Sequence, residues 1–177
     1  MILLKSFTKN KMPKIYTKTG DNGETGLYDG SRLAKTEPIF DVLGTLDELS
    51  SHIGVLIAMK GDVSLEQEFR KIQQTLLNIG SVIATPNSEG LTLPDISGIV
   101  GFIEETIDRM EEELPPLTQF LLVGGINMSE SQAHVCRTVA RRAEREFLKS
   151  GIDNDIIRLL LNRLSDYFFT LAREFTS

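Results

Sequence analysis

The chain has 177 residues, of which 41% are hydrophobic and 25% are charged, and its formal net charge is -6. This composition is typical of one globular domain with a hydrophobic core. The negative balance argues against nucleic acid as the main partner, because proteins that bind phosphate backbones carry a positive excess. A site for a smaller anion would need a local cluster of positive side chains.

We expect residues 1–13 to be a disordered tail. Their lysines and lack of acids are also compatible with a mitochondrial presequence, although arginine is missing there. No apolar run approaches the ~18 residues of a membrane-spanning helix, so we expect no membrane association. The single cysteine, Cys136, cannot form an internal disulfide, and the fold does not depend on an oxidising compartment. We expect a cytoplasmic protein, or one of the mitochondrial matrix in a eukaryote.

Residues 14–34 are rich in glycine and threonine and are expected to form short extended segments and turns. Glycines recur there at every third position: Gly20, Gly23 and Gly26. Such a loop can bind phosphate oxygens with its backbone N–H groups, helped by Lys18 and by threonine hydroxyls. Asn22 followed by glycine is also typical of a type I′ hairpin turn. The two interpretations are compatible, and the Walker pattern of P-loops is absent.

From residue 36 onward the apolar residues recur at helical spacing and predict five helices. Thr36 is expected to cap the first helix, with Pro38 in its first turn, and Asp153 to cap the last. The predicted ranges are 36–59, 63–84, 95–113, 129–148 and 153–175. We therefore expect residues 14–177 to form one all-α domain, a five-helix bundle preceded by a short extended Gly/Thr-rich loop.

One face of the first predicted helix is unusual. At helical spacing it collects four small or polar residues: Gly44, Asp47, Ser51 and Gly54. A glycine inside a helix costs about 1 kcal/mol relative to alanine. Two glycines on one face indicate that another group approaches the helix backbone closely there.

The strongest chemical signal is HVCRTVARRAERE, residues 134–146, which has four arginines within nine residues. On a helix, one narrow face is apolar: Cys136, Ala140, Ala143 and Phe147. A second stripe is basic: His134, Arg137, Arg141 and Arg145. Arg142 points elsewhere. Arginines stacked along one face repel each other, so a negative group is expected against them.

Two explanations of this basic stripe stay open. It is either a solvated surface helix, with Glu144 and Glu146 as local partners, or a clamp for a polyanion. Arginine suits the second role because its rigid donor fork matches phosphate oxygens. His134 by itself is expected to be a structural, hydrogen-bonded histidine. In the last predicted helix, Asn162 and Phe169 lie off the apolar stripe, which is explained either by an exposed polar face or by a face that meets a ligand or another subunit.

Four segments, in this order, resemble the PduO-type ATP:cob(I)alamin adenosyltransferases: YTKTGDNGETGL, VLGTLDELSSHIG, HVCRTVARRAER and LNRLSDYFFTLAR. The resemblance implies a homotrimer of five-helix bundles with active sites between subunits. It implies transfer of the 5′-deoxyadenosyl group of ATP, accompanied by Mg²⁺, to the cobalt of cob(I)alamin, with release of triphosphate. A reductase that supplies cob(I)alamin and a cobalamin-dependent enzyme that accepts the product are implied partners.

The resemblance also assigns roles to residues. The loop that wraps the triphosphate corresponds to Thr17, Lys18, Thr19, Gly20, Asp21, Gly23 and Thr25, followed by Lys35. The other nucleotide contacts correspond to Arg141, Arg142, Glu144 and Arg145 in the basic helix and to Asn162 in the last helix. Four residues are implied to be catalytic: Asp47 and Arg137 as a pair that joins subunits, Arg141, and Phe120 under the corrin ring. No residue is implied to be a protein metal ligand.

The sequence departs from the family pattern in the connector QFLLVGGIN. Val123 stands where a proline is common, Ala133 stands where a leucine is common, and the stretch from Gly125 to His134 is one residue longer. These changes concern the local geometry of the connector and leave the arginines untouched.

The implied chemistry agrees with the residue types present. Cob(I)alamin is itself a powerful nucleophile, so no Ser-His-Asp set or Cys/His metal cluster is needed. Two alternatives of other classes remain: a non-catalytic module that binds ATP or polyphosphate, and a structural bundle whose arginines bind a partner's acidic face.

Overall fold

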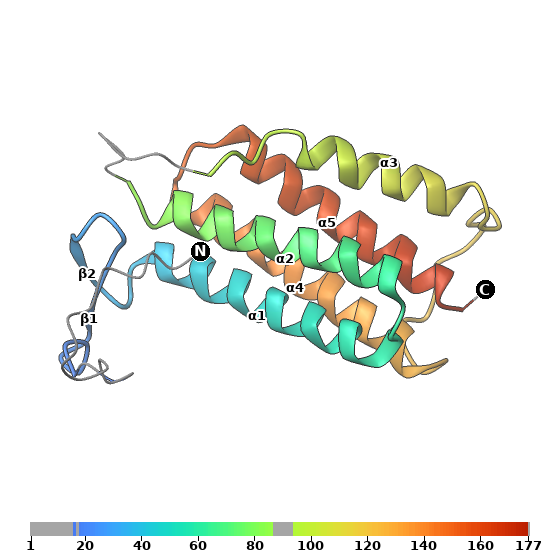
Figure 1. Ribbon diagram of the computed structural model, residues 1–177, viewed down its shortest axis with the longest axis horizontal. Helices are drawn as coiled ribbons and strands as arrows, with labels where there is room; N and C mark the ends of the chain where they lie inside the picture. The colour runs from blue at the N-terminus through green and yellow to red at the C-terminus, as the bar shows by residue number, and fades with distance from the viewer. Residues whose placement is uncertain (1–15, 17, 87–93, 177) are drawn as a thin grey trace.

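Five helices and one small hairpin make up the part of the chain that this computed structural model describes, residues 16, 18–86 and 94–176 (Figure 1). They are β1 (Glu24–Gly26), β2 (Arg32–Ala34), α1 (Pro38–Lys60), α2 (Val63–Ile83), α3 (Ile99–Glu111), α4 (Met128–Ser150) and α5 (Asp155–Glu174). The predicted all-α bundle with an extended N-terminal segment is confirmed. The expected tail, residues 1–13, and Thr17 lie outside the described ranges.

The core forms where the apolar stripes of the helices meet. α4 packs against α1 and α5, α3 packs against α5, and α1 packs against α2. The predicted stripe of the first helix is entirely buried: Val42, Leu46, Leu49, Ile53 and Leu56. Burial of each such side chain contributes about 1.5–3 kcal/mol. Cys136 is buried too, and burial raises the pKa of its thiol to about 12, as expected for a cysteine that acts as a small hydrophobe.

The starts of α1 and α3 differ from the predicted ones. The N-cap of α1 is Glu37, not Thr36, and no side chain caps it. A helix that opens on proline has one fewer unpaired N–H group at its start. α3 begins four residues later than predicted, because the carboxylate of Asp95 accepts a hydrogen bond from the Ser97 N–H and Gly98 is left-handed with φ 71°.

The starts of α4 and α5 are set by asparagine. Asn127 accepts a hydrogen bond from the Glu130 N–H, and α4 begins one residue before the predicted start. Asn154, not Asp153, caps α5 and accepts from the Ile157 N–H. Both side chains satisfy an amide that the helix itself leaves unpaired.

The hairpin exists, but its turn is not where the sequence predicted it. A type I′ turn needs positive φ at both central residues, and among the described non-glycine residues only Lys18 has positive φ. Residues 20–23 instead form an earlier turn, and residues 27–31 join β1 to β2. The Tyr28 N–H donates to the Ala84 carbonyl at 2.9 Å, and Leu27 is buried. This docking against the end of α2 fixes the hairpin on the bundle.

By length and composition alone, α1 could cross a membrane, which contradicts the prediction that no segment comes near that limit. An 18-residue window within it has a mean hydropathy of 1.3. However, Asp47 and Glu48 stand side by side in the middle of the helix, where a membrane would disfavour them. Its buried stripe packs against α2 and α4, so α1 contributes one face to the core of the bundle.

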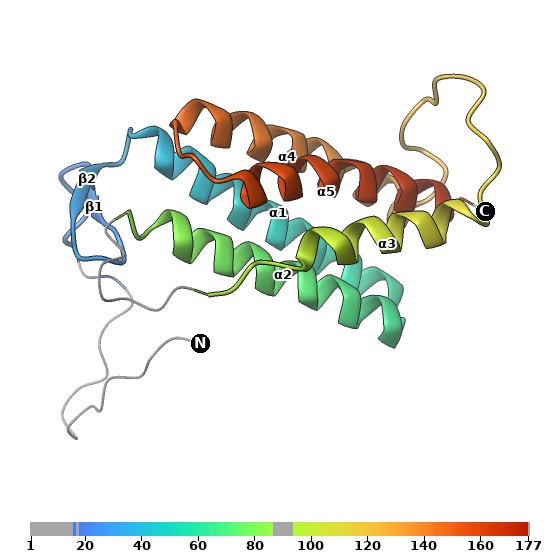
Figure 2. The same cartoon turned by 90° about the horizontal axis from the view of Figure 1, so that it is seen from above.

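The two ends of the bundle carry different features (Figures 1 and 2). The hairpin lies at the end where α1 begins and where α2 and α4 finish. The connector between α3 and α4, residues 112–127, lies at the opposite end. α4, 23 residues long, runs from the connector to the hairpin end and spans about 34 Å.

Candidate functional site

Three arginines of α4 form what we name the basic face: Arg137, Arg141 and Arg145. Arg137 is half-buried and the other two are exposed. Burial and the neighbouring charge of Arg141 lower the pKa of Arg137. Across the described ranges no carboxylate lies within ion-pair distance of any of the three. In a chain of net charge -6, this leaves a concentrated positive surface suited to an anion.

The two glutamates that could have neutralised the basic face have other partners. Glu146 pairs with Lys149 at 3.0 Å. Glu144 accepts a hydrogen bond from Asn162 at 3.0 Å. The Arg145 guanidinium donates to the Arg141 carbonyl at 3.1 Å, which is a backbone contact and not an ion pair. The explanation as a solvated helix with local acidic partners is therefore disfavoured.

The fourth arginine, Arg142, faces α1. Its guanidinium pairs with the carboxylate of Glu48, which joins α4 to α1. A nucleotide contact from Arg142, as predicted, would require this ion pair to open.

Asn162 is held from both sides. Its Nδ2 donates to Glu144, and its Oδ1 accepts from Arg163 Nη1 at 2.9 Å. Arg163 Nε in turn donates to Glu104 of α3 at 2.7 Å. A carboxylate only accepts and a guanidinium only donates, so this network fixes which way the amide points. α3 and α5 thereby set the polar group that stands beside Glu144.

His134 is buried and hydrogen-bonded, as predicted. Its Nε2 lies 3.2 Å from Glu130 Oε1, and its Nδ1 accepts from Arg137 Nε at 3.3 Å. The Phe169 ring lies 6.3 Å away, so this half-buried phenylalanine packs beside the histidine. Burial lowers the pKa of His134, the attraction of Glu130 opposes this, and the Arg137 charge adds to it. The ring is therefore neutral near pH 7.

The turn before β1 carries the other cluster of positive charge. A Cβ at Gly20 would lie 3.1 Å from Lys35 Nζ, so the lysine covers the backbone of the turn. Arg32 donates to the Thr19 carbonyl at 2.8 Å. Lys18 stands beside it in the left-handed region with φ 61°. The remaining predicted loop residues lie in the turn or in β1: Asp21, Gly23 and Thr25.

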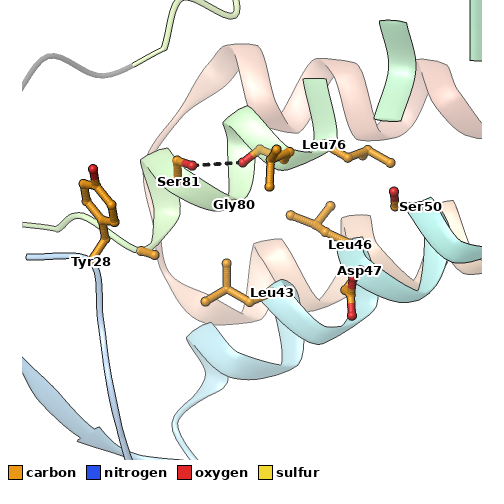
Figure 3. A pocket seen from close by; sticks show the side chains of 10 residues that line it. Tyr28, Leu43, Leu46, Asp47, Ser50, Leu76, Gly80 and Ser81 are labelled. Carbon is orange, nitrogen blue, oxygen red and sulfur yellow. Dashed lines mark hydrogen bonds between the residues drawn. The ribbon is translucent and has the colours of Figure 1, made fainter. Parts of the chain in front are cut away.

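Asp47 lies on an exposed face of α1. Nothing among the described atoms comes within 4 Å of a Cβ placed at Gly44, on the same face. The close approach predicted for this face therefore does not occur at Gly44 within one chain, but it does occur beside Gly54, where Gln73 Nε2 would lie 3.7 Å from an added Cβ and donates to the Ser50 carbonyl at 2.8 Å. Asp47 also borders a cavity of about 250 Å³ between α1 and α2, with Tyr28 at one end (Figure 3). No described ion pair joins Asp47 to Arg137 within the protomer.

The connector exposes large apolar side chains. Phe120 has a relative exposure of 105%, and Leu122 and Ile126 are exposed as well. Exposed large apolar side chains close together in one connector indicate a place where another molecule can bind. The connector, which carries Phe120, lies at one end of the bundle, whereas the hairpin lies at the other end.

Comparison with known proteins decides the family. The sequence model of the family described as cobalamin adenosyltransferase matches residues 15–175. The chain belongs to this family. A corrinoid adenosyltransferase of Bos taurus, MMAB, is 44% identical over 174 residues, which covers 92% of this chain and 71% of the bovine protein. A corrinoid adenosyltransferase of Citrobacter freundii is 39% identical over 168 residues, covering 92% of this chain and 94% of the bacterial one.

A solved structure gives the same answer. It is a variant of the PduO-type ATP:corrinoid adenosyltransferase of Lactobacillus reuteri, complexed with cobalamin and ATP. It superposes with a TM-score of 0.84 at 34% identity, covering 92% of this chain and 91% of that one. The resemblance inferred from four sequence segments is confirmed. As a cobalamin adenosyltransferase the chain is an enzyme that transfers the adenosyl group of ATP to a corrinoid.

Sequence reasoning missed the residues that form ion pairs or hydrogen bonds with the candidate site residues and so orient them. They are Glu130 for His134, Glu48 for Arg142, and Glu104 with Arg163 for Asn162. Only Glu130 had a sequence signal, since it lies four residues before His134 and therefore on the same face of the helix.

Proposed function

We propose that this adenosyltransferase acts on cob(I)alamin, forms adenosylcobalamin and releases intact triphosphate. The observation that carries the proposal is the basic face, three arginines without an acidic partner in the described ranges. Arg141 and Arg145 are four residues apart, so they lie about 6 Å apart along α4. That spacing suits neighbouring phosphates of one triphosphate.

The reaction requires little covalent chemistry from the protein. The cob(I)alamin cobalt attacks the C5′ carbon of ATP, the cobalt–carbon bond forms, and the C5′–oxygen bond breaks. The electron pair of the broken C5′–oxygen bond leaves with the triphosphate. The protein must therefore align the two substrates and stabilise charge on the leaving group. We assign the second task to Arg141 and Arg145, together with Lys18, Lys35 and the amides of the glycine turn.

Mg²⁺ fits beside the basic face. Carboxylate oxygens are ligands that Mg²⁺ accepts, and Glu144 presents one beside the basic face, whereas Asn162 turns its Nδ2 toward Glu144 at 3.0 Å and its oxygen toward Arg163. No group of three or more candidate protein ligands occurs in the described ranges, which suits an ion held mainly by phosphate oxygens and water. When bound, Mg²⁺ would neutralise part of the triphosphate charge.

Phe120 has a separate role in this proposal. Its exposed ring is suited to lie against the corrin from the lower side. An aromatic side chain there would displace the lower axial ligand of the cobalt and exclude water, which favours the Co(I) state.

We also propose that the enzyme is a homotrimer whose sites form between subunits. Three observations support a second chain at the site. Asp47 has no ionic partner in its own protomer among the described residues. Gly44 beside it is uncovered, and Phe120 is fully exposed. We place the reaction in the cytoplasm, or in the mitochondrial matrix of a eukaryote, with a reductase upstream and a cobalamin-dependent enzyme downstream.

An anoxic assay tests the proposal. Protein, ATP and chemically reduced cobalamin are mixed, and the absorption spectrum is followed while the phosphate products are separated. The expected result is conversion to adenosylcobalamin with one triphosphate per cobalamin. A module that only binds ATP would raise the melting temperature with ATP and leave the spectrum unchanged. With a structural bundle, ATP would change neither the melting temperature nor the cobalamin spectrum. An unchanged spectrum, with or without a rise in melting temperature, would reject the proposal.

A further inference from the structure

We propose that Glu130 and His134 are positioning residues of this reaction, which hold the connector and Arg137 in one fixed arrangement. The inference rests on the proposed roles of Phe120 and Arg137. It concerns how the connector end of the bundle is locked to the basic face of α4.

Glu130 ties the connector to the first turn of α4. Its side chain is buried, and Oε1 accepts a hydrogen bond from the Gly124 N–H at 2.8 Å. The Gly125 N–H donates to Ser131 Oγ at 3.0 Å, and that hydroxyl lies 3.1 Å from Glu130 Oε2. Both glycines have positive φ, 85° and 98°, which other residues rarely adopt. Two consecutive amides of the connector are thus held in one conformation.

This arrangement is not needed to start the helix. Asn127 already caps α4, because its side chain accepts from the Glu130 N–H at 2.9 Å. A buried carboxylate is unfavourable unless it is fully hydrogen-bonded. Glu130 meets that condition only while the connector amides stay in place. The cost of burying it is therefore coupled to the conformation of the connector, which carries Phe120 four residues before Gly124.

His134 extends the link to the basic face. Because a carboxylate only accepts, the His134 nitrogen that faces Glu130 carries the proton, at Nε2. Nδ1 is then the acceptor, and it accepts from Arg137 Nε at 3.3 Å. This contact leaves the terminal nitrogens of Arg137 available to other groups. Glu130, His134 and Arg137 follow one face of α4 over about 10 Å.

The first test compares Glu130→Ala with Glu130→Gln. Alanine frees the connector, and we expect kcat to fall about tenfold to hundredfold, as misplaced reacting groups do. The dissociation constant for ATP should stay within about twofold, since Arg141 is untouched. Glutamine keeps an oxygen that can accept from the Gly124 N–H and from His134, so it should recover most of kcat. A fall in ATP affinity as large as the fall in kcat would mean a general structural role and would overturn the inference.

The second test is a double-mutant cycle with Phe120→Ala. Phe120→Ala alone should slow adenosylation and leave ATP binding intact. Adding Glu130→Ala should then cost much less than it does in the wild-type background, because both changes act through the connector. Additive effects would overturn the inference. A Phe120→Ala enzyme with wild-type kcat would instead reject the proposed function of the connector, so the two failures can be told apart.

Two further variants keep the test decisive. Glu146→Ala removes a carboxylate from the same helix that pairs only with Lys149 among the described residues, and it should leave kcat and ATP binding unchanged. If Glu130→Ala does not fold, as judged by its melting curve, His134→Phe removes the acceptor for Arg137 and preserves the shape of the ring. A loss of kcat with intact ATP affinity supports the inference, and an unchanged kcat overturns it.

Discussion

The Asn162 amide donates to Glu144 Oε1 at 3.0 Å and so joins α5 to α4 beside the basic face. On its other side, Arg163 donates to the same amide at 2.9 Å. Opposite partners therefore fix its orientation before any ligand binds. A preorganised amide avoids the reorganisation that a mobile one would undergo on binding.

Asn162→Asp tests this arrangement with almost no change in shape. The aspartate cannot donate to Glu144, and two adjacent carboxylates repel each other. Loss of a hydrogen bond to a charged group costs about 1.5–3 kcal/mol, so KM for ATP should rise about tenfold or more. The measurement is an ATP titration at saturating cob(I)alamin. Asn78→Asp on α2, which contacts Gln74, is the matched control, and equal ATP titrations for both variants would exclude the role.

Arg141→Ala tests the basic face. Removing one charge-assisted contact to phosphate should raise the ATP requirement about tenfold or more. Arg142→Ala is the matched control on the same helix, because its guanidinium is engaged with Glu48. We expect it to change KM for ATP by less than about twofold and to cost about 0–1 kcal/mol of stability, as exposed ion pairs do. Equal effects of the two variants would show that Arg142 leaves Glu48 and binds the nucleotide, as the sequence predicted.

Periodicity was enough to predict the bundle and the basic face. Residues that recur at 3.6 positions lie on one side of a helix whatever it packs against, so the buried stripe of α1 and the row from Arg137 to Arg145 followed from spacing. The helix starts were less predictable. Asp153 and Asn154 are both residue types that cap helices well. Which of them caps α5 depends on the path of the loop between α4 and α5.

Contacts between distant segments could not be predicted. The Asn22–Gly23 pair favours a hairpin turn locally, yet the turn forms at residues 27–31, where Leu27 is buried and the Tyr28 N–H donates to the Ala84 carbonyl at the end of α2. Glu48 and Arg142 are 94 residues apart, and Arg163 and Glu104 are 59 apart. Spacing carries no information about pairs at such separations. The residues that support the site therefore came only from the structure.

The proposed contact between Asp47 and Arg137 of neighbouring subunits can be tested by complementation. Asp47→Ala and Arg137→Ala should each be nearly inactive, because each removes one half of every intersubunit pair. Mixed trimers, made by unfolding and refolding the two variants together, should recover activity, since some interfaces regain both wild-type residues. The measurement is the rate of adenosylcobalamin formation against the mixing ratio. Trimers that stay inactive at every ratio would place both residues in one subunit's site.

The buried His134 makes stability depend on pH. Burial lowers its pKa, the attraction of Glu130 opposes this, and the Arg137 charge adds to it, while Phe169 packs beside the ring. Burial raises the pKa of Glu130, but hydrogen bonds from Gly124 and Ser131 and the His134 charge lower it overall, so Glu130 stays ionised. A depressed histidine pKa means that the unfolded chain takes up a proton first as the pH falls. Its contribution to stability is therefore present above about pH 6.5 and is lost as the pH falls towards the pKa of the folded state.

Urea unfolding between about pH 7.5 and about pH 5 measures this loss. The wild-type free energy of unfolding should fall with decreasing pH across that range. His134→Gln removes the titrating ring and should flatten the curve, at the cost of lower stability near neutral pH. His52→Gln is the control, because His52 is the other of the two histidines and contacts Gln132 on a different face. Parallel curves for wild type and His134→Gln would show that folding leaves the pKa of His134 unchanged, since only a group whose pKa differs between the folded and unfolded states contributes a slope.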